Sequence, residues 1–389
     1  MANLSNSNND ILFNDLPFFK GDKAFSVIYL DGEFHLFFAC SKAFKSVVLH
    51  YASYDCFSWE EREVALVHNG YVDSVTAFTQ NGKIYLCYAV KNVFMLTDIR
   101  IATSKDGETF EPFPNAIIKN TSLRDIKSFY SESCRWLVGS ENKGSLPAYF
   151  SKDNFTWEKS ALTNVVKEGE IADYLGAPSP FVACGKTYVA YSMQGANVKE
   201  VEIDLTKGEL TLGKTILETY GESMRSLMVR EATPLIFIGC GSSLVPVEVY
   251  GTEQDLGFRL YRDALKSAKL RVDNGVEENK KMPATLVRER GILHIFELPA
   301  ESGVSLNFGA TSIEIDEYKS IIIDGVIENY GIVDYKLEEN ATIEITVFDM
   351  GNLIVAEVMD KLYPIPSGMS DLIKVNVGEK DYQYTSYKL

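Results

Sequence analysis

Arg124 and Asp125 are the residues of this sequence best placed to do chemistry. They lie side by side in the segment 122–130, between two apolar stretches. A charged pair at such a place is either a buried structural ion pair or a polar group that faces a pocket. In a pocket, an ionised side chain binds polar ligand groups through charge-assisted hydrogen bonds. The elements that position the pair decide between these two interpretations.

The composition favours a two-domain protein built from strands. The chain has 389 residues, more than one hydrophobic core usually holds, and 46% of them are hydrophobic. Tyr and Phe supply most of the 12% aromatic content, which favours strands and surfaces that stack on sugars. The formal charge of −16 argues against nucleic acids and anionic membranes as partners, because neutralising phosphates requires clustered Lys and Arg.

Neither the cysteines nor the histidines show a metal or redox pattern. The six cysteines are scattered without a Cys-x-x-Cys motif, and the four histidines lack metal-ligand spacing, which predicts neither a metal nor a cofactor. Most of the cysteines lie in or beside apolar runs, as buried free thiols do in a reducing compartment. Residues 1–10 lack an apolar signal core and are expected to be a disordered tail, and no window is long enough to span a membrane. We therefore expect a cytoplasmic protein.

A turn followed by an apolar strand repeats along the first 245 residues. It occurs at residues 31–38, 81–88, 133–138 and 184–189, a period of about 50 residues that is typical of propeller blades. The Asp-Gly and Asn-Gly pairs suit tight hairpins because both residues tolerate positive φ. A fifth, fainter copy has its strand at residues 234–238. The repeat predicts a five-bladed β-propeller.

Three of these units also carry a Ser-x-Asp turn, followed after three more residues by an aromatic residue. We expect each Asp to bond its own backbone and each aromatic side chain to lie between blades, in equivalent places. The aromatic residues are Trp59, Phe110 and Trp157.

After Val249 the pattern changes to short strands without these markers. The strands are expected at 292–298, 304–308, 313–315, 320–323, 342–348 and 353–358. Short strands with regular turns indicate a β-sandwich. The predicted fold is all-β, with a five-bladed propeller over residues 1–255 and a β-sandwich over residues 256–389.

In order and spacing, several segments resemble glycoside hydrolase family 32, the β-fructofuranosidases such as invertases, levanases, inulinases and sucrose-6-phosphate hydrolases. Residues 32–38 resemble the family's G-x-Y-H-L-F-Y, and residues 52–60 resemble A-x-S-x-D-L-x-x-W-E. Residues 74–77 resemble S-G-S-A, residues 123–129 resemble F-R-D-P-K-V-F, and residues 220–222 fall where D-Y-G is usual. The resemblance implies a propeller that carries the active site, followed by a β-sandwich.

The resemblance also implies roles for residues of these segments. Asp125 would bind sugar hydroxyl groups and the transition state, with Ile126 replacing the family's Pro. Arg124, Ser74, Thr76 and Glu222 would bind substrate. The alternative for Arg124 and Asp125 remains a structural ion pair at the edge of a blade.

The nucleophile of the family lies before the first propeller strand. Glycoside hydrolysis uses two carboxyl groups, about 5 Å apart in retaining enzymes. Counted back from Gly32 without a gap, the nucleophile position falls on Lys23. Asp22 is one residue away and is a possible nucleophile, and Asp15 would need a longer insertion. The alternative is that all three are solvated charges.

The acid/base of the family also departs from its pattern. Gly176 stands where a Glu is expected, and glycine cannot donate a proton. Glu168, Glu170 and Asp173 precede it and are candidates from the adjoining loop, although exposed loop charges are the simpler interpretation.

Three hypotheses about function remain open. The first is a divergent family 32 glycosidase that acts on a fructoside or a related small sugar. The second is a catalytically impaired sugar-binding or scaffolding protein that keeps the fold and Asp125. The third is a hydrolase of a related propeller family, such as an arabinosidase. The fold alone does not decide among them, because activity depends on the site.

Overall fold

The structure is a computed structural model. It describes residues 11–12, 25–42, 45–56, 58–131, 133–140, 147–160, 175–184, 186–193, 197–204, 209–218, 225–228, 235–240, 243–251, 256–261, 270–277, 284–287, 292–309, 311–324, 329–338, 341–349, 353–359, 361–366, 372–378 and 382–388. The tail predicted at residues 1–10 lies outside them.

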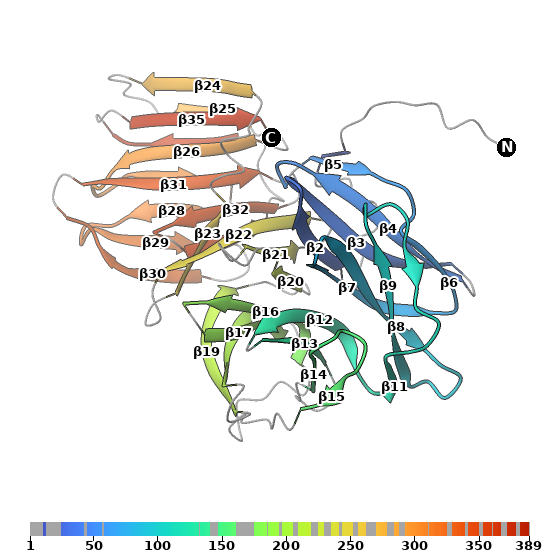
Figure 1. Ribbon diagram of the computed structural model, residues 1–389. Coiled ribbons are helices and arrows are strands. Elements are labelled where there is room, and N and C mark those ends of the chain that lie inside the picture. Colours follow the sequence, from blue (N-terminus) through green and yellow to red (C-terminus); the bar gives the residue numbers. More distant parts are fainter. Residues whose placement is uncertain are drawn as a thin grey trace, which may run out of the picture. The chain divides into compact units, whose positions relative to one another are not determined.

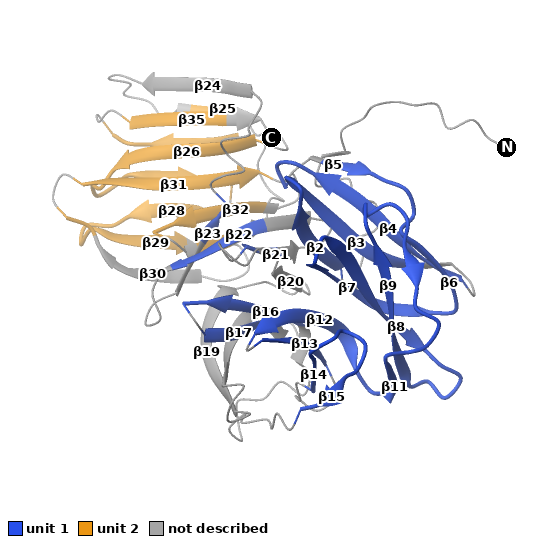
Figure 2. Ribbon diagram, in the orientation of Figure 1, with its two compact units in different colours: residues 1–261 blue, residues 262–389 orange. Residues whose placement is uncertain are grey.

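The chain divides into two compact units, residues 1–261 and 262–389 (Figure 2). Within the described residues both units consist of β-strands, and the predicted all-β class is confirmed. β23 (Leu256–Leu260) pairs with β22 (Ser243–Gly251), so the first unit continues past residue 255, where the sequence pattern placed the change. No helix in the described part of the chain is long and apolar enough to cross a membrane.

The described residues of the first unit form five antiparallel sheets that follow one another along the chain (Figure 1). The first sheet comprises β1 (Ile11–Leu12), β2 (Phe25–Leu30), β3 (Glu33–Lys42), β4 (Lys45–Ser53), β5 (Ser58–Glu61) and β6 (Leu66–Asn69). The second comprises β7 (Val72–Gln80), β8 (Lys83–Lys91), β9 (Thr97–Ser104), β10 (Glu111–Pro112) and β11 (Ile118–Thr121). The third comprises β12 (Arg124–Ser131), β13 (Cys134–Ser140), β14 (Ala148–Ser151) and β15 (Glu158–Lys159). The fourth comprises β16 (Leu175–Ala183), β17 (Lys186–Met193), β18 (Asn197–Asp204) and β19 (Glu209–Glu218). The fifth comprises β20 (Arg225–Met228), β21 (Leu235–Cys240), β22 and β23.

The first strands of successive sheets lie beside one another. β2 contacts β7, β7 contacts β12, β12 contacts β16 and β16 contacts β20. β20 also contacts β2, and the ring centroid of Phe237 lies 6.2 Å from those of Phe34 and Trp59. The order of these contacts agrees with the predicted arrangement of consecutive blades.

The repeated turn before the second strand of a sheet has the same backbone form in four sheets. Its first residue adopts positive φ at Asp31 (51°), Asn81 (52°), Ser133 (62°) and Cys184 (51°). Positive φ is unfavourable for most side chains, and Asp and Asn tolerate it best. The turn sequence therefore marks where each second strand begins, as the repeat predicted.

The three Ser-x-Asp turns have one hydrogen-bonding pattern. In each, the Ser hydroxyl donates to the Asp carboxylate at 2.9–3.0 Å and accepts the backbone N–H two and three residues on. The Trp59 and Trp157 indoles donate to the carbonyls of Cys56 and Asn154, three residues before each. Phe110 holds the same place in the second sheet and is buried. The predicted equivalence of the three aromatic residues is confirmed.

Replacing Ser151 by Ala is expected to lower the free energy of unfolding by about 1 kcal/mol, because two backbone N–H groups lose their acceptor. Lys152→Ala is the matched control, since the Lys152 side chain is exposed within the same turn. Urea unfolding of the three proteins measures the effect. Equal stability of Ser151→Ala and Lys152→Ala would show that the turn does not depend on the hydroxyl.

The described residues of the second unit form two antiparallel sheets. One has the strand order β24 (Leu270–Glu277), β35 (Tyr382–Lys388), β26 (Ile292–Pro299), β31 (Thr342–Asp349), β32 (Leu353–Val358) and β33 (Lys361–Pro366). The other has β25 (Ala284–Val287), β34 (Leu372–Asn376), β27 (Ser305–Asn307), β28 (Ser312–Ile315), β29 (Ser320–Asp324) and β30 (Asn329–Lys336). Apolar side chains of both sheets share one core, which includes Phe296, Ile313 and Ile345. The six strands predicted between residues 292 and 358 are all present.

Candidate functional site

Asp125 lies near the start of β12, the first strand of the third sheet, and this strand runs beside the second sheet. β7 and β12 run side by side, because Ser74 Oγ accepts the Ile126 N–H at 3.1 Å and Thr76 Oγ1 accepts the Ser128 N–H at 3.0 Å. Both hydroxyl groups belong to buried residues. Ser74 and Thr76 therefore lie beside the strand of Asp125 and join two sheets.

Asp125 lies near the start of β12, where the strand is distorted. The pairing of β12 with β13 shifts register between Arg124 and Lys127, and Asp125 has a φ of 46°. Such bulges re-aim side chains and are over-represented beside active sites. The first strands of the second and fourth sheets shift register at the same place, between Val72 and Ser74 and between Gly176 and Ser179.

The Asp125 carboxylate is buried at this point. The residue is 6% exposed, whereas the neighbouring Arg124 is exposed. Ser140 Oγ donates to Asp125 Oδ2 at 3.2 Å and lies 3.4 Å from the Arg124 carbonyl oxygen. Gly139 allows this close approach, because a Cβ there would stand 2.8 Å from the Arg124 oxygen. Ser140 is thus a hydroxyl partner of the buried Asp125 carboxylate.

Lys127, which the sequence analysis did not assign to the site, connects the same strand to two other sheets. Lys127 is 2% exposed, and its Nζ donates to the carbonyl oxygens of Phe25 at 2.7 Å and Val75 at 3.3 Å. These oxygens belong to β2 and β7, so one ammonium group ties the first strands of three sheets together. A buried ammonium needs such partners, because its desolvation is costly. The available signal was a third charged residue in the strand, two positions after Asp125 and directly after the buried Ile126.

A second lysine, Lys91, lies at the end of the second sheet that is near Asp125. Lys91 ends β8 and donates from Nζ to Thr97 Oγ1 at 2.9 Å. Burial lowers the pKa of Lys91, the carboxylates of Asp73 and Asp125 oppose this shift, and the Arg124 guanidinium adds to it. The site therefore combines two acidic and two basic groups within electrostatic reach of one another.

Several predicted site residues cannot be placed. Asp22 and Glu222 lie outside the described residues, as do the alternatives Lys23 and Asp15 and the loop acids Glu168, Glu170 and Asp173. Gly176 lies near the start of β16, the first strand of the fourth sheet, opposite Ser192. It therefore holds a place in its sheet similar to those of Ser74 and Asp125.

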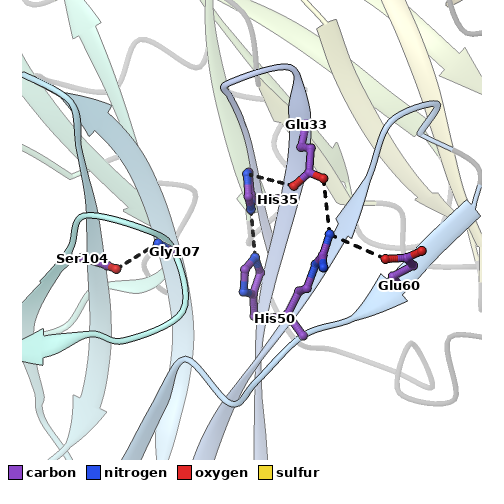
Figure 3. Close-up of polar contacts among 7 residues, drawn as sticks. Glu33, His35, His50, Glu60, Ser104 and Gly107 are labelled. Carbon is purple, nitrogen blue, oxygen red and sulfur yellow. Dashed lines mark hydrogen bonds and ion pairs between the residues drawn. The ribbon is translucent and has the colours of Figure 1, made fainter. Parts of the chain in front are cut away.

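A separate polar cluster lies between the first two sheets (Figure 3). His35 Nδ1 and His50 Nε2 are 3.0 Å apart, and both residues are buried. Glu33 Oε2 stands 4.0 Å from His35 Nε2 and bonds Arg62 through its other oxygen. The Ser104 turn of the second sheet packs on the pair, since a Cβ at Gly107 would lie 3.6 Å from His50 Cε1.

Burial dominates the electrostatics of this histidine pair. Burial, followed by the charges of the neighbouring His35 and Arg62, lowers the pKa of His50 to about 3. Burial also lowers the pKa of His35, although the Glu33 carboxylate opposes the shift. His50 Nδ1 is buried without a hydrogen-bond partner. No group of three His, Cys, Asp or Glu side chains in the described part of the chain could hold a metal ion.

Comparison with known protein families gives a match within the first unit. Residues 25–203 match the model of the glycosyl hydrolases family 32 N-terminal domain, so the resemblance predicted from the sequence is confirmed. No curated protein sequence matches the chain.

Solved structures share the fold over nearly the whole chain. Sucrose-6-phosphate hydrolase from Lactobacillus gasseri is 14% identical with a TM-score of 0.71, over 94% of this chain and 91% of its own. The family 32 β-fructofuranosidase of Bombyx mori is 17% identical with a TM-score of 0.69, over 94% and 90%. Fructan 1-exohydrolase IIa from Cichorium intybus is 11% identical with a TM-score of 0.68, over 95% of each chain. Variants of the last two have been solved with sucrose and with 1-kestose.

Proposed function

We propose that the first unit binds fructosides or closely related small sugars at the end of the first strands where Asp125 lies. The observation that carries the proposal is the buried Asp125 carboxylate at a bulge of β12, held by Ser140. A buried carboxylate accepts hydrogen bonds from hydroxyl groups, and a sugar provides such groups.

The family match supports a fructoside as the sugar. Residues 25–203 match the family 32 domain, and relatives with this fold hold sucrose and 1-kestose, both of which contain fructose. The Ser74 and Thr76 hydroxyl groups each accept one backbone N–H of β12, which positions this strand, and each keeps its O–H donor for a sugar. Arg124 is exposed beside Asp125 and remains a candidate ligand for the sugar.

A second candidate function is hydrolysis of the bound fructoside. The family match favours a fructosidase-type glycosidase. It requires a nucleophile such as Asp22 and an acid from elsewhere than Gly176. The five free cysteines among the described residues agree with a reducing compartment, and we expect the protein to act in the cytoplasm.

Substitution of Asp125 by Asn is expected to weaken the binding of methyl β-D-fructofuranoside by at least about tenfold, because charged hydrogen bonds contribute about 1.5–3 kcal/mol. Asn tolerates the φ of 46° at this position, so the fold should persist. Isothermal titration calorimetry measures the affinity, and Asp31→Asn is the matched control in an exposed turn at similar φ. Equal affinity of the two variants would contradict the role of Asp125.

A further inference from the structure

Four consecutive apolar residues stand exposed in the connection between β8 and β9. Val93 is 90% exposed, Phe94 and Met95 are each 76% exposed, and Leu96 is 39% exposed. Single exposed apolar residues are ordinary, but a contiguous run of them marks a binding surface. We call these four residues the apolar hairpin.

The backbone of the apolar hairpin is fixed. Asn92 Oδ1 accepts the N–H groups of Phe94 at 3.0 Å and Leu96 at 3.2 Å. The Asn92 backbone bonds Leu96 and Met95 in turn, and Met95 adopts a φ of 60°. A surface that is already ordered loses little conformational entropy on binding a ligand. The hairpin therefore presents its apolar side chains in a preset arrangement.

The apolar hairpin is tethered to the chain that leads into Asp125. Asn92 Nδ2 donates to Asn120 Oδ1 at 3.0 Å, and the Asn120 N–H donates to Asp98 Oδ1 at 2.9 Å. Asn120 precedes Asp125 by only five positions. These hydrogen bonds connect one side of the hairpin to the segment that contains Asp125, the residue proposed to bind the sugar.

Strand register places the hairpin and Asp125 at the same end of the sheets. Ser74 pairs with Ala89 on β8, and its hydroxyl accepts the N–H of Ile126, directly after Asp125. Lys91 follows Ala89 by two residues, ends β8 and leads into the hairpin. The charge of Asp125 acts on Lys91, which agrees with this arrangement.

We propose that the apolar hairpin contacts the group attached to the anomeric oxygen of the bound fructoside and favours ligands in which this group carries an aromatic ring or a similarly large apolar group. The inference rests on the proposed function of the Asp125 site. A sugar held by a buried carboxylate extends from it toward solvent, and the exposed hairpin lies at the same end of the sheets as Asp125. Val, Met and Leu side chains offer no hydrogen bonds to a second sugar, but they bury apolar surface well.

The test compares two ligands that differ only in the leaving group, methyl and benzyl β-D-fructofuranoside. Calorimetry should show the benzyl compound binding about tenfold more tightly, because partial burial of its ring gains roughly 1.4 kcal/mol. The double variant Phe94→Ser, Met95→Ser should lose this difference and keep the wild-type affinity for the methyl compound. Free fructose should compete with both ligands.

The matched control is Phe155→Ser. Phe155 is also an exposed aromatic residue, at 39%, but it follows β14 and contacts Tyr85 near the start of β8, at the other end of the sheet. This variant should keep the preference for the benzyl compound. Near-UV circular dichroism checks that each variant retains the wild-type fold.

The outcomes separate this inference from the proposed function. If wild-type protein binds neither compound, the proposed function fails and the inference with it. If the wild type binds both equally, or if the preference survives in the double variant, the inference alone is overturned. Self-association that the double variant abolishes, without any ligand preference, would assign the hairpin to contact with a second copy and would also overturn it.

Discussion

Purified protein should release little or no fructose from sucrose, inulin or levan. General acid assistance typically contributes about 10²–10⁴-fold to the rate, and Gly176 has no side chain to supply it. Counted back from Gly32 without a gap, the expected nucleophile position falls on Lys23, and on this assignment its ammonium cannot stabilise a developing cation at the anomeric carbon. Fructose released over time, measured beside an active invertase, tests the expectation.

Introducing the missing acid provides the complementary experiment. Gly176→Glu is expected to raise the rate of fructose release if this position faces the scissile bond, and Gly176→Gln, which cannot donate a carboxyl proton, should not. Robust turnover by the unmodified protein would contradict the loss of catalysis. Asp22→Asn would then test the nearest candidate nucleophile, and activity that survived this change would show that the N-terminal segment is wrongly assigned.

The stability of the first unit should fall steeply in acid because of the His35–His50 pair. His50 has a folded-state pKa of about 3, below the unfolded value of about 6.5, so the unfolded state binds more protons between these values. The contribution of His50 is complete above about pH 6.5 and is lost as the pH falls toward 3, by about 1.4 kcal/mol for each pH unit. Urea unfolding at pH 7.5, 6.5, 5.5 and 4.5 measures the slope.

Two variants isolate the histidine contribution. His50→Phe keeps an aromatic ring beside Phe37, with which His50 stacks at a centroid distance of 4.6 Å, and removes the titrating group. Its stability should depend less on pH than that of the wild type across this range. His68→Phe is the control, since His68 is only half-buried. Parallel pH profiles for wild type and His50→Phe would refute the linkage.

The propeller could be predicted from sequence because its signals are local. The Asp31 and Asn81 turns and the Ser-x-Asp turns are closed by hydrogen bonds within a few residues, so their sequence dictates their conformation. The strands of the second unit could also be predicted, because apolar residues alternate along them and fill one shared core. The end of the first unit, at residue 261, depends on the pairing of β23 with β22, and no local sequence pattern predicts this pairing.

The site was less predictable because its contacts join distant parts of the chain. Asp125 was found by motif, but its partner Ser140 lies 15 positions away on the next strand. Lys127 reaches Phe25, 102 positions earlier, and no spacing rule links such residues. Ser74 and Thr76 were predicted to bind substrate, but the bonds that their hydroxyl groups accept from β12 could not be read from the sequence, because the partners lie 52 positions away. The histidine pair could not be predicted either, because His35 and His50 come into contact only when β3 and β4 pair.

The contact of Phe237 with Phe34 and Trp59 has a consequence for how the protein is made. Each of the five sheets can form as soon as its own residues have left the ribosome, because each is built from strands that are close in the chain. The first sheet, however, leaves one flank uncovered until β21 arrives about 200 residues later. Pairings of such high sequence separation are slow to form. During synthesis, the uncovered aromatic side chains of the first sheet are therefore a natural place for a chaperone to bind.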